Sequence, residues 1–145
     1  MNITTDDSLK LENQLCFPLY ACSKEIIKMY KPFLDKLDLT YTQYITMIVL
    51  WEKKSQSVKE LGEVLYLDSG TLTPVLKKLE SKGYLTRQRS LTDERSLVVT
   101  ITEKGEALKE DARFIPQNVA KCIPLSKEEE AKLYYLLYKI LNSIE

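Results

Sequence analysis

The 145-residue sequence contains no histidine, and its three cysteines, Cys16, Cys22 and Cys122, include no Cys-x-x-Cys pair. Without histidine there can be no Ser-His or Cys-His nucleophile system, and the cysteine spacing excludes the common zinc sites. An odd number of widely spaced cysteines does not make a disulfide framework, so free thiols are expected in a reducing compartment. The sequence therefore predicts no metal, no cofactor and a protein that is not an enzyme.

Long apolar runs are missing as well. The longest is YITMIVLW, residues 44–51, which is far short of the roughly 20 residues that cross a membrane. The first ten residues, MNITTDDSLK, are polar and acidic and do not resemble a secretory signal. We therefore expect a cytoplasmic protein with no membrane partner.

The sequence also lacks a net charge, because 21 basic residues balance 21 acidic ones. The chain as a whole therefore has no electrostatic attraction toward nucleic acid. The charges are unevenly placed, however, and between Ser69 and Arg95 six cationic side chains face three anionic ones. A local basic surface is predicted there.

Only four glycines and five prolines interrupt the chain, which leaves long stretches with helical periodicity. A helix is predicted over residues 9–30, with Pro18 marking a kink or a late start, and a short helical piece follows Pro32. A buried helix over 40–54 is expected to begin at a cap on Thr40 or Thr42. The segment from Ser57 to Glu60 has the pattern of a capping box and should open a short helix that reaches residue 65.

A tight turn, YLDSG, separates that helix from a second one. We expect the second helix to begin near Gly70 or Thr71, so that Pro74 falls in its first turn, and to end at Gly83. The segments YLTRQRS and RSLVVTIT alternate like strands and predict a two-stranded hairpin. A further helix, interrupted near Pro116 and closed by Pro124, leads to a last helix.

The last helix should be capped by Ser126, and its remainder, AKLYYLLYKILNSI, is apolar on nearly every side. A surface helix of a monomer keeps one polar face. This helix is therefore expected to be covered by another chain.

A short helix, a tight turn, a second helix and a hairpin together have the order of a winged helix-turn-helix. The second helix would bury its Leu/Val face and present hydroxyl and amino groups to a major groove. The predicted DNA contacts on this helix and the hairpin are Ser69, Thr71, Thr73, Lys77, Lys78, Arg87, Arg89 and Arg95. Arg95 lies just past the hairpin tip and could enter a minor groove. The same pattern also fits a helical hairpin with solvated lysines and an ordinary β-turn.

Four stretches carry a resemblance to a known family. DERSLVVT, residues 93–100, resembles the wing of the MarR family of bacterial transcriptional regulators. LENQLCFPLYACSKE, YKPFLDKLDLTYTQY and LGEVLYLDSGTLTPVLKKLE resemble its organic-hydroperoxide-resistance (OhrR-type) branch. The resemblance implies a mainly α fold with a small β-hairpin wing. The single chain, residues 1–145, would have a winged helix-turn-helix lobe over 41–103 and dimerisation helices over 1–40 and 104–145.

The same resemblance implies a homodimer that binds a pseudopalindromic operator in double-stranded DNA. Cys16 matches the cysteine that organic hydroperoxides oxidise in that branch, and Tyr30 and Tyr41 match tyrosines that contact this thiol from the second subunit. Tyr20 lies one turn along from Cys16. An early position in a helix favours a thiolate, although a packed core thiol is the ordinary role of a helical cysteine.

The other two cysteines have different expectations. Cys22 falls deeper in the apolar arc of its helix and is predicted to be a core residue. Cys122 lies near the C-terminal helices, where two-cysteine members of the family carry a resolving cysteine. Whether Cys122 or a small thiol caps the oxidised Cys16 as a mixed disulfide stays open.

Four other functions can be weighed against the sequence. A MarR-type regulator can be released by a small aromatic ligand, and a thiol-based regulator can control virulence or general stress genes with the same chemistry. A thiol peroxidase with an accidental helix-turn-helix pattern is disfavoured, because no cationic residue is predicted beside Cys16. An inert interaction scaffold would leave Arg87, Arg89 and Arg95 unexplained.

Overall fold

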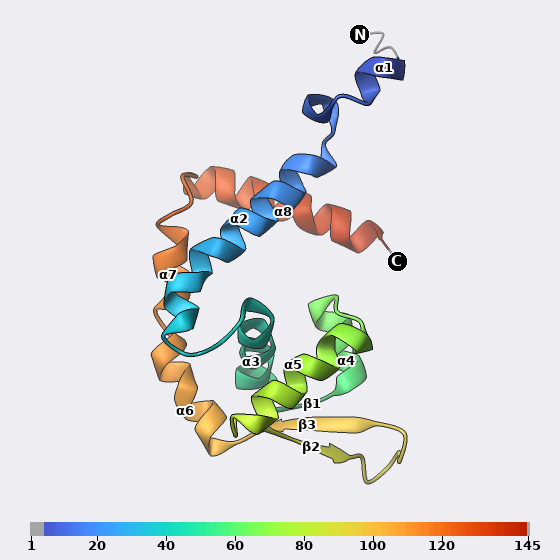
Figure 1. The fold of residues 1–145 in the computed structure, drawn as a ribbon, viewed down its shortest axis with the longest axis vertical. Helices are drawn as coiled ribbons and strands as arrows, with labels where there is room; N and C mark the ends of the chain where they lie inside the picture. Colours follow the sequence, from blue (N-terminus) through green and yellow to red (C-terminus); the bar gives the residue numbers. More distant parts are fainter. Residues whose placement is uncertain (1–4, 145) are drawn as a thin grey trace. The chain divides into compact units, whose positions relative to one another are not determined.

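The computed structural model describes residues 5–144 and divides between Ile115 and Pro116 into two compact units. The first unit begins with α1 (Thr5–Ser8), the 3-10 turn η1 (Leu11–Asn13), α2 (Cys16–Asp35) and α3 (Tyr41–Lys53) (Figure 1). It continues with β1 (Ser55–Ser57), α4 (Val58–Leu65), α5 (Ser69–Ser81), β2 (Leu85–Arg89), β3 (Leu97–Ile101) and α6 (Glu103–Ala112). The unit boundary falls in α7 (Ile115–Ala120), and α8 (Lys127–Ser143) belongs to the second unit.

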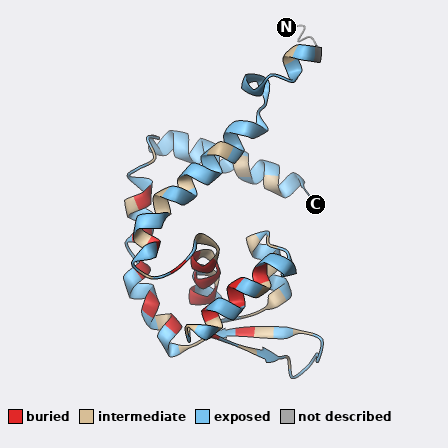
Figure 2. Cartoon of the chain, in the orientation of Figure 1, coloured by how far each residue is buried: buried red, intermediate tan, exposed pale blue. Residues whose placement is uncertain are grey.

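The part of the first unit from α3 to α6, called the lobe below, is closed around one apolar core. Leu50 of α3, Leu61 of α4, Leu79 of α5 and Val99 of β3 are each 0% exposed. Met47, Leu72, Leu76 and Leu85 complete the innermost layer. Figure 2 shows buried residues in red on α3, α5 and β3. The predicted Leu/Val face of α5 is therefore confirmed as the buried face.

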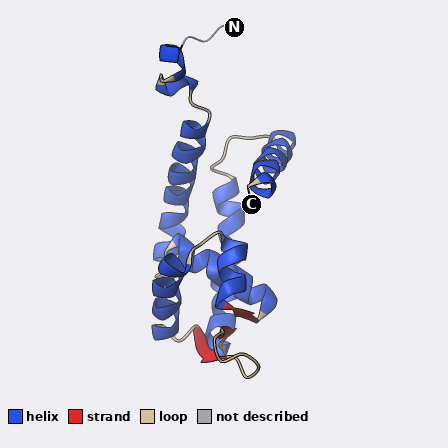
Figure 3. Ribbon diagram, turned by 90° about the vertical axis from the view of Figure 1, so that its right-hand side faces the viewer, coloured by secondary structure: helices blue, strands red, loops and turns tan. Residues whose placement is uncertain are grey.

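The sheet has three antiparallel strands in the order β1-β3-β2, where a two-stranded hairpin was predicted. The β2–β3 register runs from Leu85 opposite Ile101 to Arg89 opposite Leu97. The strand that the prediction missed, β1, is only Ser-Gln-Ser and carries no alternating pattern. It becomes a strand because Ser55 pairs with Thr100 across the sheet. Figure 3 shows the strands and the wing loop at one end of the unit.

The predicted capping box at Ser57 and the predicted cap at Ser126 are confirmed, and Thr40 is the cap of α3 where Thr40 or Thr42 was expected; all three are capping boxes. At α3 the Thr40 hydroxyl accepts a hydrogen bond from the backbone N–H of Gln43, and the side-chain oxygen of Gln43 accepts one from the backbone N–H of Thr40. The same reciprocal pair joins Ser57 to Glu60 at α4, and Ser126 to Glu129 at α8. Each box satisfies two backbone donors that a helix start leaves without intrahelical partners.

The long helix α2 differs from the prediction at one end. It begins at Cys16, which confirms the late start before Pro18, but it continues through Pro32 to Asp35 instead of breaking there. Pro32 is exposed and lies in the last turn of the helix. One missing backbone donor at that position interrupts the ladder only where the helix is about to end.

The helix α5 begins earlier than predicted. The Asp68 side chain accepts from the Thr71 amide at 2.7 Å and caps the helix, so Ser69 is its first residue and Pro74 lies beyond the first turn. The predicted stop at Gly83 is confirmed, since Gly83 has φ of 81°. Amides of Gly83 and Tyr84 donate back to the carbonyls of Glu80 and Leu79, at 2.9 and 3.1 Å. This is a Schellman motif, which glycine favours.

The segment after the wing forms two helices, and the predicted interruption near Pro116 is found just before it, at Arg113–Phe114. The second of these helices, α7, ends at Ala120, earlier than the predicted stop at Pro124. Within α6, Gly105 lies against the Tyr84 carbonyl and Ile101 so closely that a Cβ would overlap them. A glycine is therefore required where α6 meets the base of the wing.

The terminal helices leave their apolar side chains uncovered. No described residue of α8 is buried, and Leu34 is the only buried residue of α2. Leu133, Leu136, Tyr138 and Ile140 of α8 are each 41–44% exposed. None of the described helices is both long and apolar enough to cross a membrane.

Candidate nucleic-acid interface and thiol site

The helix α5 presents a polar surface opposite its buried face. Ser69, Thr71, Lys77 and Lys78 are exposed and Thr73 is half-buried. The period of 3.6 residues separates them from the leucines that pack inward. Gly70, Pro74 and Ser81 are also exposed on this helix and were not among the predicted contacts, although a helical wheel places all three opposite the buried leucines.

Arg87 joins the wing to α5. Its guanidinium Nη2 lies 3.0 Å from Glu80 Oε1, and its backbone amide donates to Glu80 Oε2 at 3.0 Å. The hydrogen bond from Arg87 holds the pKa of Glu80 below its ordinary value. Arg87 and Arg89 share a strand face, as predicted, but that face also carries the buried Leu85. Arg87 is thus engaged inside the lobe, and its role in DNA binding stays a prediction.

The wing carries two exposed arginines, Arg89 at the end of β2 and Arg95 in the loop between β2 and β3. Arg89 Nη1 donates to the Glu94 carbonyl at 2.7 Å across the loop. The Asp93 carboxylate accepts from the Arg95 amide at 3.0 Å, and the Asp93 carbonyl accepts from the Ser96 amide at the same distance. The Arg95 side chain is exposed and makes no ion pair with any of residues 5–144.

The C-terminal end of α5 is anchored to the α2–α3 loop by Lys82. The Lys82 ammonium donates to the Asp38 carbonyl and lies 3.3 Å from the Asp38 carboxylate. Lys104 in turn donates to the Lys82 carbonyl at 2.8 Å. Two of the six cations between Ser69 and Arg95, Lys82 and Arg87, therefore have partners inside the lobe. The exposed basic surface consists of Lys77, Lys78, Arg89 and Arg95.

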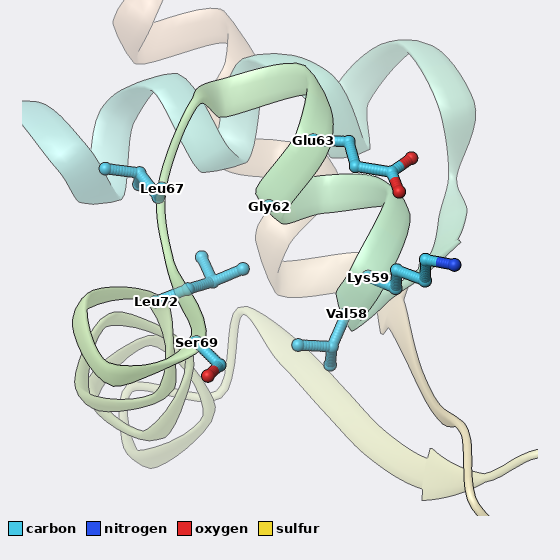
Figure 4. A pocket seen from close by; sticks show the side chains of 7 residues that line it. All are labelled: Val58, Lys59, Gly62, Glu63, Leu67, Ser69 and Leu72. Atoms are coloured by element: carbon cyan, nitrogen blue, oxygen red, sulfur yellow. The ribbon is translucent and has the colours of Figure 1, made fainter. Parts of the chain in front are cut away.

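A pocket of about 450 Å³ lies between α4 and the start of α5 (Figure 4). Its lining consists of Val58, Lys59, Gly62, Glu63, Leu67, Ser69 and Leu72. The lining contains one cation, Lys59, and one anion, Glu63, which are one turn apart on α4, so it carries no net charge.

Cys16 is the first residue of α2 and is exposed. The positive end of the helix dipole therefore acts on its sulfur, and no described residue hydrogen-bonds it. Cys22 is exposed as well, so the prediction of a core residue is wrong. Cys22 lies on the apolar side of α2, but Leu34 is the only residue of this helix that is buried.

Cys122 lies in the turn after α7, in the second unit. Its amide donates to the Val119 carbonyl at 2.9 Å, and its thiol donates to the Asn118 carbonyl at 3.5 Å. It is exposed. Its reaction with an oxidised Cys16 stays a prediction.

The predicted tyrosines fall into two groups. Tyr20 is exposed, and the Lys24 ammonium lies 5.1 Å from its ring centroid. Tyr30 and Tyr41 meet edge to face, with ring centroids 5.0 Å apart. Tyr30 lies 14 residues after Cys16 on the same helix, or about 21 Å at 1.5 Å per residue. Tyr30 therefore cannot contact Cys16 of its own chain.

Tyr44 completes this aromatic cluster and was missed. Its ring centroid lies 5.7 Å from that of Tyr30 and 6.3 Å from that of Tyr41. Burial raises the pKa of Tyr30 and of Tyr41, and it raises the pKa of Tyr44 to about 12. The signal in the sequence was its position one turn after Tyr41 on the same helix.

The helix pair α4–α5, the exposed polar face of α5 and the antiparallel wing define a winged helix-turn-helix protein. The family described as transcriptional regulator SarA/Rot matches residues 28–112. The organic hydroperoxide resistance transcriptional regulator of Bacillus subtilis is 51% identical over 138 residues, which are 95% of this chain and 94% of the relative.

Solved structures give the same result. The structure of reduced AbfR bound to DNA, from Staphylococcus epidermidis, matches with a TM-score of 0.80 at 31% identity. The match covers 97% of this chain and 96% of the AbfR chain. A mutant MarR from Escherichia coli, in complex with operator DNA, has a TM-score of 0.80 at 28% identity, covering 88% of this chain and 93% of its own. The chain therefore belongs to the MarR family of transcriptional regulators, in its organic-hydroperoxide-resistance branch.

Proposed function

We propose that this chain is a redox-sensing repressor that binds operator DNA when reduced and releases it when organic hydroperoxides oxidise Cys16. The observation that carries the proposal is the position of Cys16, an exposed thiol at the first residue of α2. The relative from Bacillus subtilis, named for organic hydroperoxide resistance, supports the choice of oxidant.

The DNA-reading surface is α5 together with the wing. Ser69, Thr71, Thr73, Lys77 and Lys78 face the major groove, where hydroxyls and amines reach base edges and phosphates. Arg95 enters the minor groove, and Arg89 supports it from the strand. Arg87 contributes mainly by holding the wing against α5 through Glu80. Two such surfaces in a dimer would read half-sites roughly 10 bp apart.

The dimer is built from the terminal helices. The exposed leucines and tyrosines of α8 and the uncovered apolar arc of α2 would otherwise leave a large apolar surface in water. Since Tyr30 is too far from Cys16 within one chain, the thiol of one subunit is contacted by Tyr30 and Tyr41 of the partner subunit. Tyr20 flanks the thiol one turn along its own helix.

The chemistry needs only the peroxide and a second thiol. The Cys16 thiolate attacks the O–O bond of the hydroperoxide, which gives a sulfenic acid and, after protonation, an alcohol. The sulfenic acid then condenses with a thiol, either Cys122 or a small thiol, to form a disulfide and water. Both steps change the size and hydrogen bonding of the group that the tyrosines surround.

This change is large enough to release DNA. A hundredfold loss of affinity corresponds to about 2.7 kcal/mol, and losing a buried hydrogen-bond partner costs roughly 1–3 kcal/mol. Breaking one or two hydrogen bonds between the tyrosines and the sulfur is therefore sufficient to move the two α5 helices out of register with the operator.

The test compares the wild-type protein with Cys16→Ser in a gel shift on the gene's own upstream DNA, with and without cumene hydroperoxide. The wild-type complex should dissociate with oxidant, while the variant should bind equally well and stay bound. Cys22→Ser is the matched control on the same helix and should respond like wild type. A Cys16→Ser protein that still releases DNA would remove Cys16 from the mechanism.

The same assay separates the remaining possibilities. Intact mass of Cys122→Ser after oxidation distinguishes a disulfide to Cys122 from a mixed disulfide with a small thiol. Release by an aromatic acid under reducing conditions would indicate a ligand-controlled regulator, and catalytic turnover of peroxide with a thiol reductant would indicate a peroxidase.

A further inference from the structure

Tyr44 lies at the centre of the aromatic cluster that contains the two proposed sensor tyrosines. Tyr30 comes from α2, whereas Tyr41 and Tyr44 come from the first turns of α3. The Tyr44 ring packs against both of the others, with centroids 5.7 and 6.3 Å away. Tyr44 is 3% exposed, so its ring is the buried support on which the two half-buried rings rest.

The hydroxyl groups of the cluster are unengaged. None of residues 5–144 forms a hydrogen bond to the hydroxyls of Tyr30, Tyr41 or Tyr44. No described side-chain oxygen or nitrogen is both buried and without a partner, so the Tyr44 hydroxyl reaches the surface although its ring does not. The three phenols therefore combine fixed rings with free hydroxyls.

The cluster continues toward the wing through Trp51. The Tyr44 and Trp51 rings meet edge to face, with centroids 6.4 Å apart. The Trp51 indole N–H donates a buried hydrogen bond of 2.8 Å to the Gly105 carbonyl. Gly105 itself lies in close contact with the Tyr84 carbonyl and Ile101, which are the residue before β2 and the last residue of β3.

We propose that Tyr44 is a positioning residue for the peroxide-sensing site. Its ring holds Tyr30 and Tyr41 in place and, through Trp51, connects them to the base of the wing. The inference rests on the proposed function for the role of Tyr30 and Tyr41. The packing that links Tyr44, Trp51 and Gly105 is independent of that role.

The arrangement has a mechanical consequence. Tyr30 moves with α2 and Tyr41 moves with α3, so any displacement of α2 against α3 must be absorbed by the ring that both contact. Close-packed aromatic rings change between discrete arrangements and do not deform smoothly. A shift at Tyr44 is passed to Trp51, whose hydrogen bond fixes α3 to the Gly105 backbone beneath the wing.

The first experiment tests positioning with Tyr44→Leu and Tyr44→Phe, using the full-length reduced protein. In Tyr44→Leu, NMR titration of labelled tyrosine Cζ atoms should show the pKa values of Tyr30 and Tyr41 moving toward the ordinary tyrosine value. The rate of Cys16 oxidation by cumene hydroperoxide should change about tenfold or more, because the sulfur loses fixed neighbours. Tyr44→Phe keeps the ring and should retain the wild-type behaviour in both measurements.

Trp51→Phe tests the link to the wing, and it does not depend on whether Tyr44→Leu folds. Phenylalanine keeps the aromatic contact but cannot donate to the Gly105 carbonyl. We expect the ratio of reduced to oxidised operator affinity to fall about three- to tenfold, with Cys16 oxidised as fast as in wild type. Ile48→Ala, on the exposed side of α3, is the control and should leave the ratio unchanged.

The outcomes separate this inference from the proposed function. If wild-type protein itself ignores the peroxide, the proposed function fails, while the NMR titration still tests the packing role of Tyr44. If wild type responds but Tyr44→Leu and Trp51→Phe match it in all readouts, the positioning role is overturned. Loss of the wild-type oxidation rate in Tyr44→Phe would assign the role to the hydroxyl and overturn the role of the ring.

Discussion

The lobe and the terminal helices use the same kinds of apolar side chains in opposite ways. In the lobe, leucines of α3, α4 and α5 reach 0% exposure within one chain. On α8, Leu133, Leu136 and the three tyrosines are 43–65% exposed, Leu137 and Leu141 are half-buried, and no described residue is buried. On α2 only Leu34 is buried. The difference teaches that the lobe completes its core within one chain, whereas the terminal helices leave apolar faces that a second copy of the chain would cover in the proposed dimer.

The largest expected effect contrasts Leu76→Ala with Leu136→Ala. Leu76 is 1% exposed, so its truncation should lower the free energy of unfolding by about 2–5 kcal/mol. Leu136 is 44% exposed, and its truncation should leave unfolding of the lobe within about 0.5 kcal/mol of wild type. Urea denaturation followed by fluorescence of Trp51, the only tryptophan, measures both. Equal losses in the two variants would break the comparison.

The second prediction is that alkaline pH lowers the free energy of unfolding of the lobe. Burial raises the pKa of Tyr44 from 10.0 to about 12. Because the pKa of Tyr44 is higher in the folded than in the unfolded protein, the unfolded state ionises first as the pH rises. The stability that the neutral Tyr44 side chain contributes is therefore complete below pH 10 and is lost as the pH rises through about 12. The loss from Tyr44 amounts to about 2–3 kcal/mol. Urea unfolding at a series of pH values should show a shallower decline in Tyr44→Phe, which cannot ionise there; an unchanged decline would contradict the assignment.

A charge on α8 should act on assembly and leave the lobe intact. Leu136→Asp places a carboxylate among the apolar side chains of α8, so dimer affinity should fall at least about tenfold, or about 1.4 kcal/mol. Analytical ultracentrifugation over a concentration series gives this value directly. Ile48→Asp, at an exposed apolar position of α3, is the control and should dimerise normally. A Leu136→Asp protein with wild-type affinity would show that α8 is not at the interface.

The smallest effect uses two chemically identical caps. Ser57 and Ser126 each form a capping box with a glutamate three residues later. Ser57→Ala should lower the unfolding free energy of the lobe by about 1 kcal/mol. Ser126→Ala should leave that unfolding unchanged and weaken dimerisation instead, because its helix belongs to the other unit. Replacement by aspartate, which also caps, should restore each property and serves as the control.

The caps, the stop at Gly83 and the late start of α2 could be read from the sequence because they depend on residues within a few positions of one another. The ends of α2 and α7 and the first residue of α5 were predicted incorrectly. Thr40 with Gln43, Ser57 with Glu60, and the turn at Gly83 are local interactions. The alternation of the wing strands and the Leu/Val face of α5 follow from the periods of strand and helix. Family resemblance added the prediction that Cys16, Tyr30 and Tyr41 form the sensor.

Only the tertiary structure decided the features that join distant residues. The Ser-Gln-Ser segment forms β1 because it pairs with β3. Arg87 forms an ion pair with Glu80, and Lys82 forms one with Asp38. Tyr44 became the centre of a cluster, and Cys22 was left exposed, because burial depends on which elements cover a helix. The physical reason is that a side chain's free energy is set by its neighbours in space, and for these residues the deciding neighbours are far away in the chain or absent from it.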